Sequence, residues 1–496
     1  MQYHSTRNTE TLVSPAEAIL QGLSPDGGLY IFSKLPQLDP EAVLSSEPMA
    51  MSARILEAFF PDLPEVEELV RRAYEGKFDA PDLVPTVPVG PYQVLELFHG
   101  PTSAFKDVAL CLLPHLMGAA KKVTAAKTGE KDLTLHVLTA TSGDTGKAAL
   151  SGFADVPGTM ITVFYPHGGV SAMQRLQMVT QPGTNVHVAG IRGNFDDAQR
   201  GVKTLFTDAE LEKALAQKGI RLTSANSINI GRLVPQIMYY FKVYADLLKR
   251  GQVKMGDPVN FCVPTGNFGD ILAGYLAGLL GLPVGKLIIA SNKNNVLTDF
   301  FHSGTYDRRR KLYTTVAPSM DILVSSNLER LLFLLSGCDP ALTAAYMKEL
   351  SEGGSYSISP QLHSALKDSF LSDYATDRQA KEMIAKVYQE HHYLMDPHTA
   401  IAWAVAERYT AAFPEDVSPM VVLSTASCYK FPQTVLEALD ALAPEDPFEQ
   451  LFLLNRLTGV PVSKPLLSLQ QLPELHPQVI DQQSMKSFVW KEGLNS

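Results

Sequence analysis

The chain has 496 residues and a mass of 54.2 kDa, enough for roughly two or three domains with cores of their own. Hydrophobic residues make up 45% and charged residues 19%, a balance that is ordinary for an enzyme-sized soluble protein. The formal net charge of -10 excludes a general binder of nucleic acids or acidic membranes, because no basic excess is available to neutralise phosphates.

The sequence predicts neither a membrane span nor a secretory signal. The longest apolar tract, 271–284, is interrupted by glycines and a proline and is too short to cross a bilayer. The first eight residues contain no apolar run, so we expect no signal peptide. The cysteines are isolated from one another, without a metal or redox spacing, which is typical of a reducing compartment. We therefore expect a cytoplasmic protein.

Residues 1–90 predict a helix-rich N-terminal segment, in which 22–30 forms a turn followed by a short extended piece. A Pro-dense linker, 81–91, separates this segment from an apolar strand at 94–98. The strand leads through a Gly-Pro turn, with Thr102 or Ser103 as a possible cap, into the next helix.

That helix begins near Phe105 and carries a one-sided apolar stripe, interrupted only by Pro114. Lys106 lies in its first turn, beside the stripe. A cation at this position opposes the helix dipole and has apolar neighbours, so both effects favour the neutral amine. A neutral lysine amine forms a Schiff base with an aldehyde cofactor. An ordinary exposed lysine is the alternative, and the spacing alone favours it.

The residues from about 130 to 225 alternate between strands and helices, which predicts a parallel sheet flanked by helices. The expected strands are 133–139, 160–165 and 186–191, and the expected helices are 144–153 and 170–179. A second series follows, with a helix beginning at Phe268, further helices filling 341–412, and strands at 259–263, 286–290 and 420–423. The sequence thus predicts an α/β fold that ends in a Pro-punctuated tail, 461–496.

Three turns at expected strand ends contain residue types that bind small ligands there. In 264–270 (PTGNFGD), two glycines let the backbone close around an anion and an asparagine supplies an amide. The turn 139–147 (TATSGDTGK) is rich in hydroxyls but lacks the pattern of a nucleotide P-loop. In 424–432 (STASCYKFP), a short hydroxyl can bond a ring nitrogen. Each turn is also compatible with a plain helix start or cap.

Three histidines, His391, His392 and His398, lie near Asp396 and invite a comparison with metal sites. They lack a recognised ligand spacing and straddle a Pro turn. We assign no metal.

Short motifs of one family occur in an order and separation that span almost the whole chain: YHSTR (3–7), PDGGLY (25–30), GPTSAFKD (100–107), SGDTG (142–146), NSINIGR (226–232), GNFGD (266–270), SNKNNVL (291–297), SMDILVSSNLER (319–330) and DPHTA (396–400). Together they resemble the threonine synthases of the longer bacterial and fungal type. These are pyridoxal-phosphate enzymes of fold type II.

The resemblance implies a tryptophan synthase β-like α/β fold. It would comprise an N-terminal threonine-synthase domain (1–90), a catalytic region (91–460) into which a smaller subdomain (roughly 130–225) is inserted, and the tail (461–496).

The resemblance also implies roles for individual residues. Lys106 would hold the pyridoxal phosphate and move protons, and Thr425 would meet the pyridine nitrogen. The cofactor phosphate would lie in the loop Gly266, Asn267, Phe268, Gly269 and Asp270. The substrate would contact Ser142, Gly143, Asp144, Thr145, Asn229 and Arg232. Many relatives carry His-Pro shortly after the position of Thr425, whereas this chain has Ser427-Cys428-Tyr429, so no histidine role is expected there.

The implied activity is that of a carbon-oxygen lyase in threonine biosynthesis, converting O-phospho-L-homoserine and water to L-threonine and phosphate. A phospholyase or dehydratase that releases 2-oxobutyrate is the alternative enzyme, and a ligand-binding protein on an inactive scaffold is the alternative outside catalysis. Retention of Lys106 with its companion loops argues against the inactive scaffold. We expect a small-molecule substrate and no nucleic-acid or membrane partner. The resemblance favours a monomer, with a dimer left open.

Overall fold

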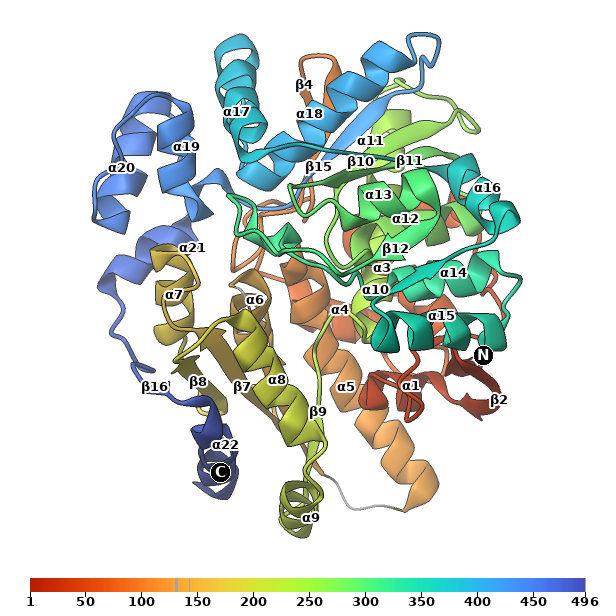
Figure 1. Cartoon of the computed structure of the whole chain (residues 1–496), viewed down its shortest axis with the longest axis vertical. Coiled ribbons are helices and arrows are strands. Elements are labelled where there is room, and N and C mark those ends of the chain that lie inside the picture. The colour runs from red at the N-terminus through yellow and green to blue at the C-terminus, as the bar shows by residue number, and fades with distance from the viewer. Residues whose placement is uncertain (130–132, 142, 496) are drawn as a thin grey trace.

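The computed structural model describes residues 1–129, 133–141 and 143–495. Two α/β lobes make up most of it, and the N-terminal residues lie against the larger lobe (Figure 1). Ser142, expected to contact substrate, lies outside the described residues.

The N-terminal segment is helix-rich as predicted, but it opens with an antiparallel sheet that the sequence did not predict. The sheet has the order β2-β1-β3 and comprises β1 (Tyr3–Ser5), β2 (Asn8–Val13) and β3 (Tyr30–Phe32). The helices are α1 (Pro15–Gln21), α2 (Pro40–Leu44), α3 (Pro48–Phe59) and α4 (Val66–Tyr74). The extended piece expected after the turn at 22–30 is β3.

The predicted linker 81–91 is partly wrong, because Thr86–Val89 forms strand β4 and pairs antiparallel with β5 (Tyr92–Glu96). Strand β4 lies at the edge of its sheet. Pro88 is tolerated there, since an edge strand does not need every backbone N–H for the ladder.

The larger sheet has the order β14-β11-β10-β15-β5-β4, and all neighbours except β5 and β4 are parallel. Its remaining strands are β10 (Val259–Pro264), β11 (Val284–Ser291), β14 (Phe370–Tyr374) and β15 (Met420–Ser424). The strands predicted at 259–263, 286–290 and 420–423 are confirmed. The prediction that 341–412 is filled by helices missed two short strands, β13 (Ser355–Ser357) and β14, of which β14 lies at the edge of this sheet.

Helices and short strands surround this sheet. The helices are α5 (Lys106–Thr128), α10 (Ile230–Leu233), α11 (Ile237–Lys249), α12 (Gly269–Leu279), α13 (Val296–Ser303), α14 (Leu328–Leu335), α15 (Pro340–Glu352), α16 (Pro360–Ser369), α17 (Asp377–His391), α18 (Pro397–Ala412) and α19 (Pro432–Ala438). Short 3-10 turns are η1 (Val234–Gln236), η2 (Pro318–Met320) and η3 (Cys428–Lys430), and β12 (Thr305–Asp307) pairs with β13 (Ser355–Ser357).

The smaller sheet is parallel throughout and has the order β16-β8-β7-β6-β9. Its strands are β6 (Thr134–Ala140), β7 (Thr159–Pro166), β8 (Val186–Ile191), β9 (Ile220–Thr223) and β16 (Val479–Ile480). The helices of this lobe are α6 (Asp144–Phe153), α7 (Ala172–Val179), α8 (Phe195–Phe206) and α9 (Ala209–Gln217). The predicted alternation of strands and helices is confirmed here.

The last residues are not a separate tail. After α20 (Pro447–Thr458) and α21 (Lys464–Leu467), the chain runs from the larger to the smaller lobe, where α22 (Met485–Asn495) ends it (Figure 1). Strand β16 extends the smaller sheet, and Met485 and Val489 are buried in that lobe's core. Turns η4 (Ser468–Gln471) and η5 (Gln482–Ser484) connect these elements.

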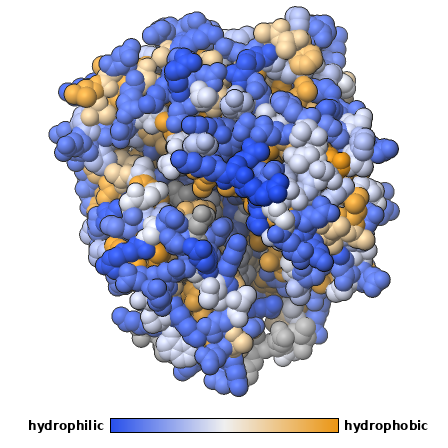
Figure 2. Space-filling model, viewed as in Figure 1, coloured by the Kyte–Doolittle hydropathy of each residue, from blue (hydrophilic) through white to orange (hydrophobic). Residues whose placement is uncertain are grey.

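Helix α5 continues past Pro114 and lies at the centre of the largest hydrophobic core, with Val108, Leu112 and Leu116 fully buried. Among the helices of the described residues, none is both long and apolar enough to cross a membrane. Ligands usually bind at the carboxyl ends of the strands of a parallel sheet. Here the loops of interest follow the carboxyl ends of β5, β10 and β15 in the larger sheet and of β6 in the smaller one. The face of the molecule that is seen in Figures 1 and 2 is hollowed near its centre (Figure 2).

Candidate active site

The loop before Lys106 is held by the loop that follows β15. The N–H of Phe105 donates to the carbonyl of Thr425 at 2.9 Å, and the N–H of Ser427 donates to the carbonyl of Ser103 at 3.0 Å. Two strand ends that are neighbours in the sheet therefore place Lys106 and Thr425 close together.

The predicted capping of α5 by Thr102 or Ser103 is wrong. Phe105 occupies the cap position and makes no side-chain bond to the helix. Thr102 instead donates its N–H and its hydroxyl to the carboxylate of Asp107, at 2.8 and 2.5 Å. Asp107, in the first turn of α5, thus fixes the loop on which Lys106 depends.

Lys106 is the first residue of α5 and is half-buried. Its Nζ lies 3.4 Å from Oγ of Ser319. Burial lowers the pKa of the amine to about 8, and the positive charges of Arg232 and Lys430 act in the same direction, while Asp144 opposes them. The direction is the one predicted from the sequence, and it increases the neutral fraction of the amine at physiological pH.

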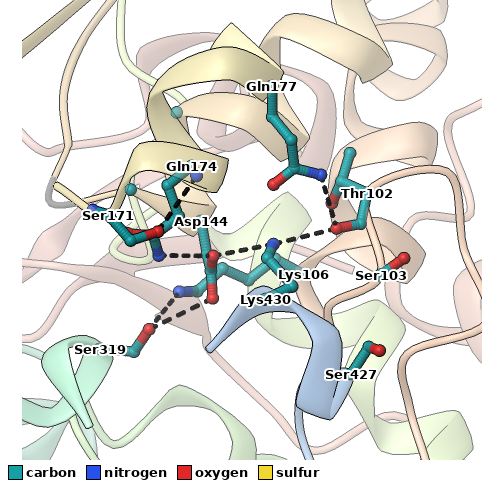
Figure 3. Close-up of polar contacts among 12 residues, drawn as sticks. Thr102, Ser103, Lys106, Asp144, Ser171, Gln174, Gln177, Ser319, Ser427 and Lys430 are labelled. Carbon is teal, nitrogen blue, oxygen red and sulfur yellow. Dashed lines mark hydrogen bonds and ion pairs between the residues drawn. The ribbon is translucent and has the colours of Figure 1, made fainter. Parts of the chain in front are cut away.

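Asp144 lies beside Lys106 in a polar network (Figure 3). Its carboxylate forms an ion pair with Lys430 at 2.8 Å and accepts hydrogen bonds from Gln174 at 3.0 Å and Ser319 at 3.4 Å. The charge of Lys430 outweighs burial and holds the pKa of Asp144 well below its usual range. Asp144 is the first residue of α6 and not its cap, because Gly143 stands at the cap position without a side-chain bond.

The turn 141–146 is shaped around a threonine hydroxyl. Oγ1 of Thr141 accepts the N–H of Gly143 at 3.0 Å and that of Gly146 at 2.8 Å. Gly143 has φ +138°, and a Cβ there would lie 2.5 Å from the side chain of Gln174, so a side chain is excluded on both counts. Thr145 lies half-buried in the first turn of α6.

The loop 266–270 packs tightly on the segment that carries Ser319. A Cβ on Gly266 would lie 2.7 Å from the carbonyl oxygen of Ser319, and the hydroxyl of Ser325 donates to the carbonyl of Gly266 at 2.7 Å. Phe268 is buried in the left-handed region at φ +64°. Gly269 follows it as the first residue of α12, where the first N–H groups have no acceptor within the helix.

The side chains on either side of that turn differ in exposure. Asn267 is exposed, and its backbone carbonyl accepts hydrogen bonds from Asn327. Asp270 is only 5% exposed and accepts the N–H of Ile271 at 2.8 Å. Burial raises the pKa of Asp270 to about 7. A carboxyl that is partly protonated near neutral pH repels a neighbouring anion less than a carboxylate does.

Arg232 is a buried cation without a carboxylate partner among the described residues. It is 4% exposed, its Nη1 donates to the carbonyl of Ala225 at 2.9 Å, and its Nε has no hydrogen-bond partner in the part of the chain described. Burial lowers its pKa to about 10. Its positive charge contributes to the lowered pKa of Lys106.

Asn229 is engaged at the start of α10, the helix that carries Arg232. Its Oδ1 accepts the N–H of Gly231 at 2.9 Å, and its Nδ2 donates to the carbonyl of Ile19 at 2.9 Å. The side chain is thus committed to capping and to the N-terminal segment. Its expected contact with substrate stays a prediction, as does the expected role of Thr425, which lies buried after β15.

Sequence reasoning missed the residues that hold Ser319. His398 accepts the N–H of Ser319 at its Nε2, 3.2 Å away, while its Nδ1 donates to Asp396 at 2.7 Å. This arrangement requires the neutral ring with the proton on Nδ1. The DPHTA motif and the lysine in 424–432 were visible signals, but nothing in the sequence connected them to Lys106.

Three family models match the chain: "Pyridoxal-phosphate dependent enzyme" over residues 80–426, "Threonine synthase N terminus" over 2–74 and "Threonine synthase, C-terminal" over 399–461. The threonine synthase of Pseudomonas aeruginosa is 39% identical over 457 residues, which cover 90% of this chain and 92% of the relative. Threonine synthase-like 1 of Macaca fascicularis is 36% identical over 463 residues, and the match covers 90% of this chain but 61% of that protein's length.

Solved structures agree with these matches. The crystal structure of PLP-bound threonine synthase from Brucella melitensis superposes with a TM-score of 0.85 at 36% identity, covering 99% of each chain. The match extends over both lobes and the N-terminal segment. The chain belongs to the threonine synthase family of pyridoxal-phosphate-dependent enzymes.

Proposed function

We propose that the protein converts O-phospho-L-homoserine and water to L-threonine and phosphate. The observation that carries the proposal is the guanidinium of Arg232, which is buried without a carboxylate partner among the described residues and whose charge acts on Lys106. It supplies an anion site next to a reactive amine, as a phosphorylated amino acid requires.

A buried charge without a partner is costly, so a protein retains one where a ligand of opposite charge completes the site. Asp144 does not compensate Arg232, because its carboxylate is paired with Lys430. A substrate carboxylate or phosphate would fill this role. The planar guanidinium suits either group, since it can donate two parallel hydrogen bonds.

The residues around Lys106 also fit pyridoxal phosphate. The close packing of Gly266, the left-handed turn at Phe268 and the start of α12 support a phosphate cradle at 266–270. We propose that this loop holds the cofactor phosphate, that Lys106 binds the aldehyde carbon, and that Thr425 meets the pyridine nitrogen. Bound there, the cofactor supplies an electron sink that makes protons at Cα and Cβ of the substrate acidic.

The chain's own groups would then manage protons and charge. With a pKa of about 8, roughly a tenth of the Lys106 amine is neutral at pH 7 and can accept the Cα proton. Loss of a second proton at Cβ expels phosphate from Cγ, water adds at Cβ, and protons return to Cγ and Cα. Arg232 would hold one anionic group of the substrate through these steps, and the backbone N–H groups of Asp144 and Thr145 would donate to the other.

We also propose a cytoplasmic location, on the basis of the isolated cysteines, and a monomeric state, on the basis of the resemblance. Size-exclusion chromatography with light scattering checks the second, and a mass near 54 kDa is the expected result.

The test is product identification. Purified protein loaded with pyridoxal phosphate is incubated with O-phospho-L-homoserine, and the products are identified by proton and phosphorus NMR. Equal amounts of threonine and phosphate are expected. Phosphate with 2-oxobutyrate would select a phospholyase instead, and no phosphate at all would overturn the substrate. The Lys106→Ala variant should lose both the cofactor absorbance and turnover, which ties any activity to this site.

A further inference from the structure

The hydroxyl of Ser319 contacts both Lys106 and Asp144 (Figure 3). Its Oγ is 3.4 Å from Nζ of Lys106 and 3.4 Å from Oδ2 of Asp144. Neither contact was anticipated from the sequence.

The direction of these hydrogen bonds is fixed by Asp144. Lys430, which is fully buried, keeps that carboxylate ionised, so it accepts hydrogen bonds and donates none. The Ser319 hydroxyl therefore donates a hydrogen bond to Asp144, and its lone pairs face Lys106. The hydroxyl can then act only as an acceptor for an N–H of the amine.

The backbone of Ser319 is held as firmly as its side chain. Its N–H donates to Nε2 of His398, whose ring is fixed by Asp396, and its carbonyl packs against Gly266. Both supports belong to the larger lobe, whereas Asp144 belongs to the smaller one. The hydroxyl is thus oriented by groups from both lobes.

We propose that Ser319 is a positioning residue for the Lys106 amine: its hydroxyl accepts a hydrogen bond that aims the amine and favours its protonated form. The proposal rests on the proposed function only in taking Lys106 as the reacting amine. A hydrogen bond to a charged group stabilises that charged form, so removing the hydroxyl should make the amine release its proton more easily.

Other charges around Lys106 stay unchanged when Ser319 is replaced. The groups that face it are Asp144 on α6, Asp270 on α12, Arg232 on α10 and Lys430 on η3. None of them is altered in charge by a substitution at Ser319. A change in the titration of Lys106 therefore reports on the hydroxyl.

The test measures that titration in the full-length chain freed of cofactor and checked for native circular dichroism. Trace acetic anhydride labels neutral amines, and mass spectrometry of the Lys106 peptide gives the labelling rate as a function of pH. The exposed Lys34 is the internal reference. In S319A the midpoint for Lys106 should fall by about one pH unit, which corresponds to one hydrogen bond to a charged group.

Two further variants distinguish the effect of the hydroxyl from the effect of side-chain volume. S319C is nearly isosteric but its thiol is a weak acceptor, so its midpoint should fall as in S319A. S319T keeps the hydroxyl and should restore the wild-type midpoint. With cofactor present, kcat should fall severalfold in S319A and S319C with little change in KM, and recover in S319T. Ser303, exposed at the end of α13, supplies the control S303A.

An unchanged midpoint in S319A and S319C overturns the proposal, whatever their activity. A rise in the midpoint also overturns it, because it would show that the hydroxyl donates to the amine. Absence of threonine formation by the wild-type protein overturns the proposed function instead, and leaves the titration result to be judged alone.

Discussion

The buried carboxyl of Asp270 should make the stability of the cofactor-free chain depend on pH. Its pKa is raised by burial from an ordinary value of 3.8 to about 7. The folded chain therefore binds a proton at pH values where the unfolded chain has released it. Stability attributed to this group is largest at low pH, falls as the pH rises from about 4 to 7, and is constant above that range.

The magnitude follows from the same two values. A difference of roughly 3 pH units corresponds to about 4 kcal/mol at about 1.4 kcal/mol per unit. Part of this decrease in the free energy of unfolding is already present at pH 5, so about 2 to 3 kcal/mol of it occurs between pH 5 and pH 8. Asp270→Asn removes the ionisation and retains an oxygen that can accept the N–H of Ile271.

The assay is urea unfolding of the wild type and the variant at both pH values, without cofactor. The free energy of unfolding of the variant, relative to that of the wild type, should rise by about 2 to 3 kcal/mol from pH 5 to pH 8. A difference between the two proteins that is the same at both pH values would refute the claim that Asp270 is protonated on folding. Cofactor is left out because a nearby phosphate would shift the titration of the carboxyl.

Three further variants test the surrounding site. Arg232→Ala should raise KM for O-phospho-L-homoserine by about 10- to 100-fold, the usual effect of losing a charge-assisted hydrogen bond. The cofactor absorbance of this variant should be unchanged. Loss of the cofactor would mean that Arg232 binds the cofactor instead of the substrate. Gly266→Ala places a Cβ 2.7 Å from a backbone carbonyl oxygen, so cofactor affinity measured by absorbance titration should fall at least about tenfold. The control is Gly118→Ala, which should bind cofactor normally because no atom of the described residues lies within 4 Å of the added Cβ. Lys430→Met leaves Asp144 buried without its ion-pair partner, so it should lower the free energy of unfolding, measured with urea, by about 3 to 5 kcal/mol. A decrease below about 1 kcal/mol would contradict the importance of this ion pair.

Local sequence patterns predicted the central strands well. The runs that became β8, β10 and β15 are short, apolar and bounded by turn residues, and all are buried in the middle of parallel sheets. Edge strands escaped prediction for physical reasons. Strand β4 contains a proline and β16 has two residues, so their pairing is decided by the sheet beside them and not by their own pattern.

The candidate site divides in the same way. Lys106 and the turns 141–146 and 266–270 could be predicted, because glycines and hydroxyls at strand ends are visible in the chain. The polar groups around Lys106 could not, because Ser319 lies far along the chain from it and the partner of Asp144 is Lys430, a residue of the other lobe. These contacts exist only after both lobes fold. The cap that Asn229 forms on α10 was also not readable from its motif, and its expected contact with substrate stays a prediction.

The central claim is that this site eliminates phosphate from Cγ and adds water at Cβ. The most direct measurement is to run the reaction on O-phospho-L-homoserine in water enriched in oxygen-18 and analyse the products by mass spectrometry. We predict threonine that carries one solvent oxygen in its side-chain hydroxyl, together with phosphate that carries none. Label in the phosphate, accompanied by unlabelled homoserine, would show hydrolysis of the phosphate ester and contradict the account.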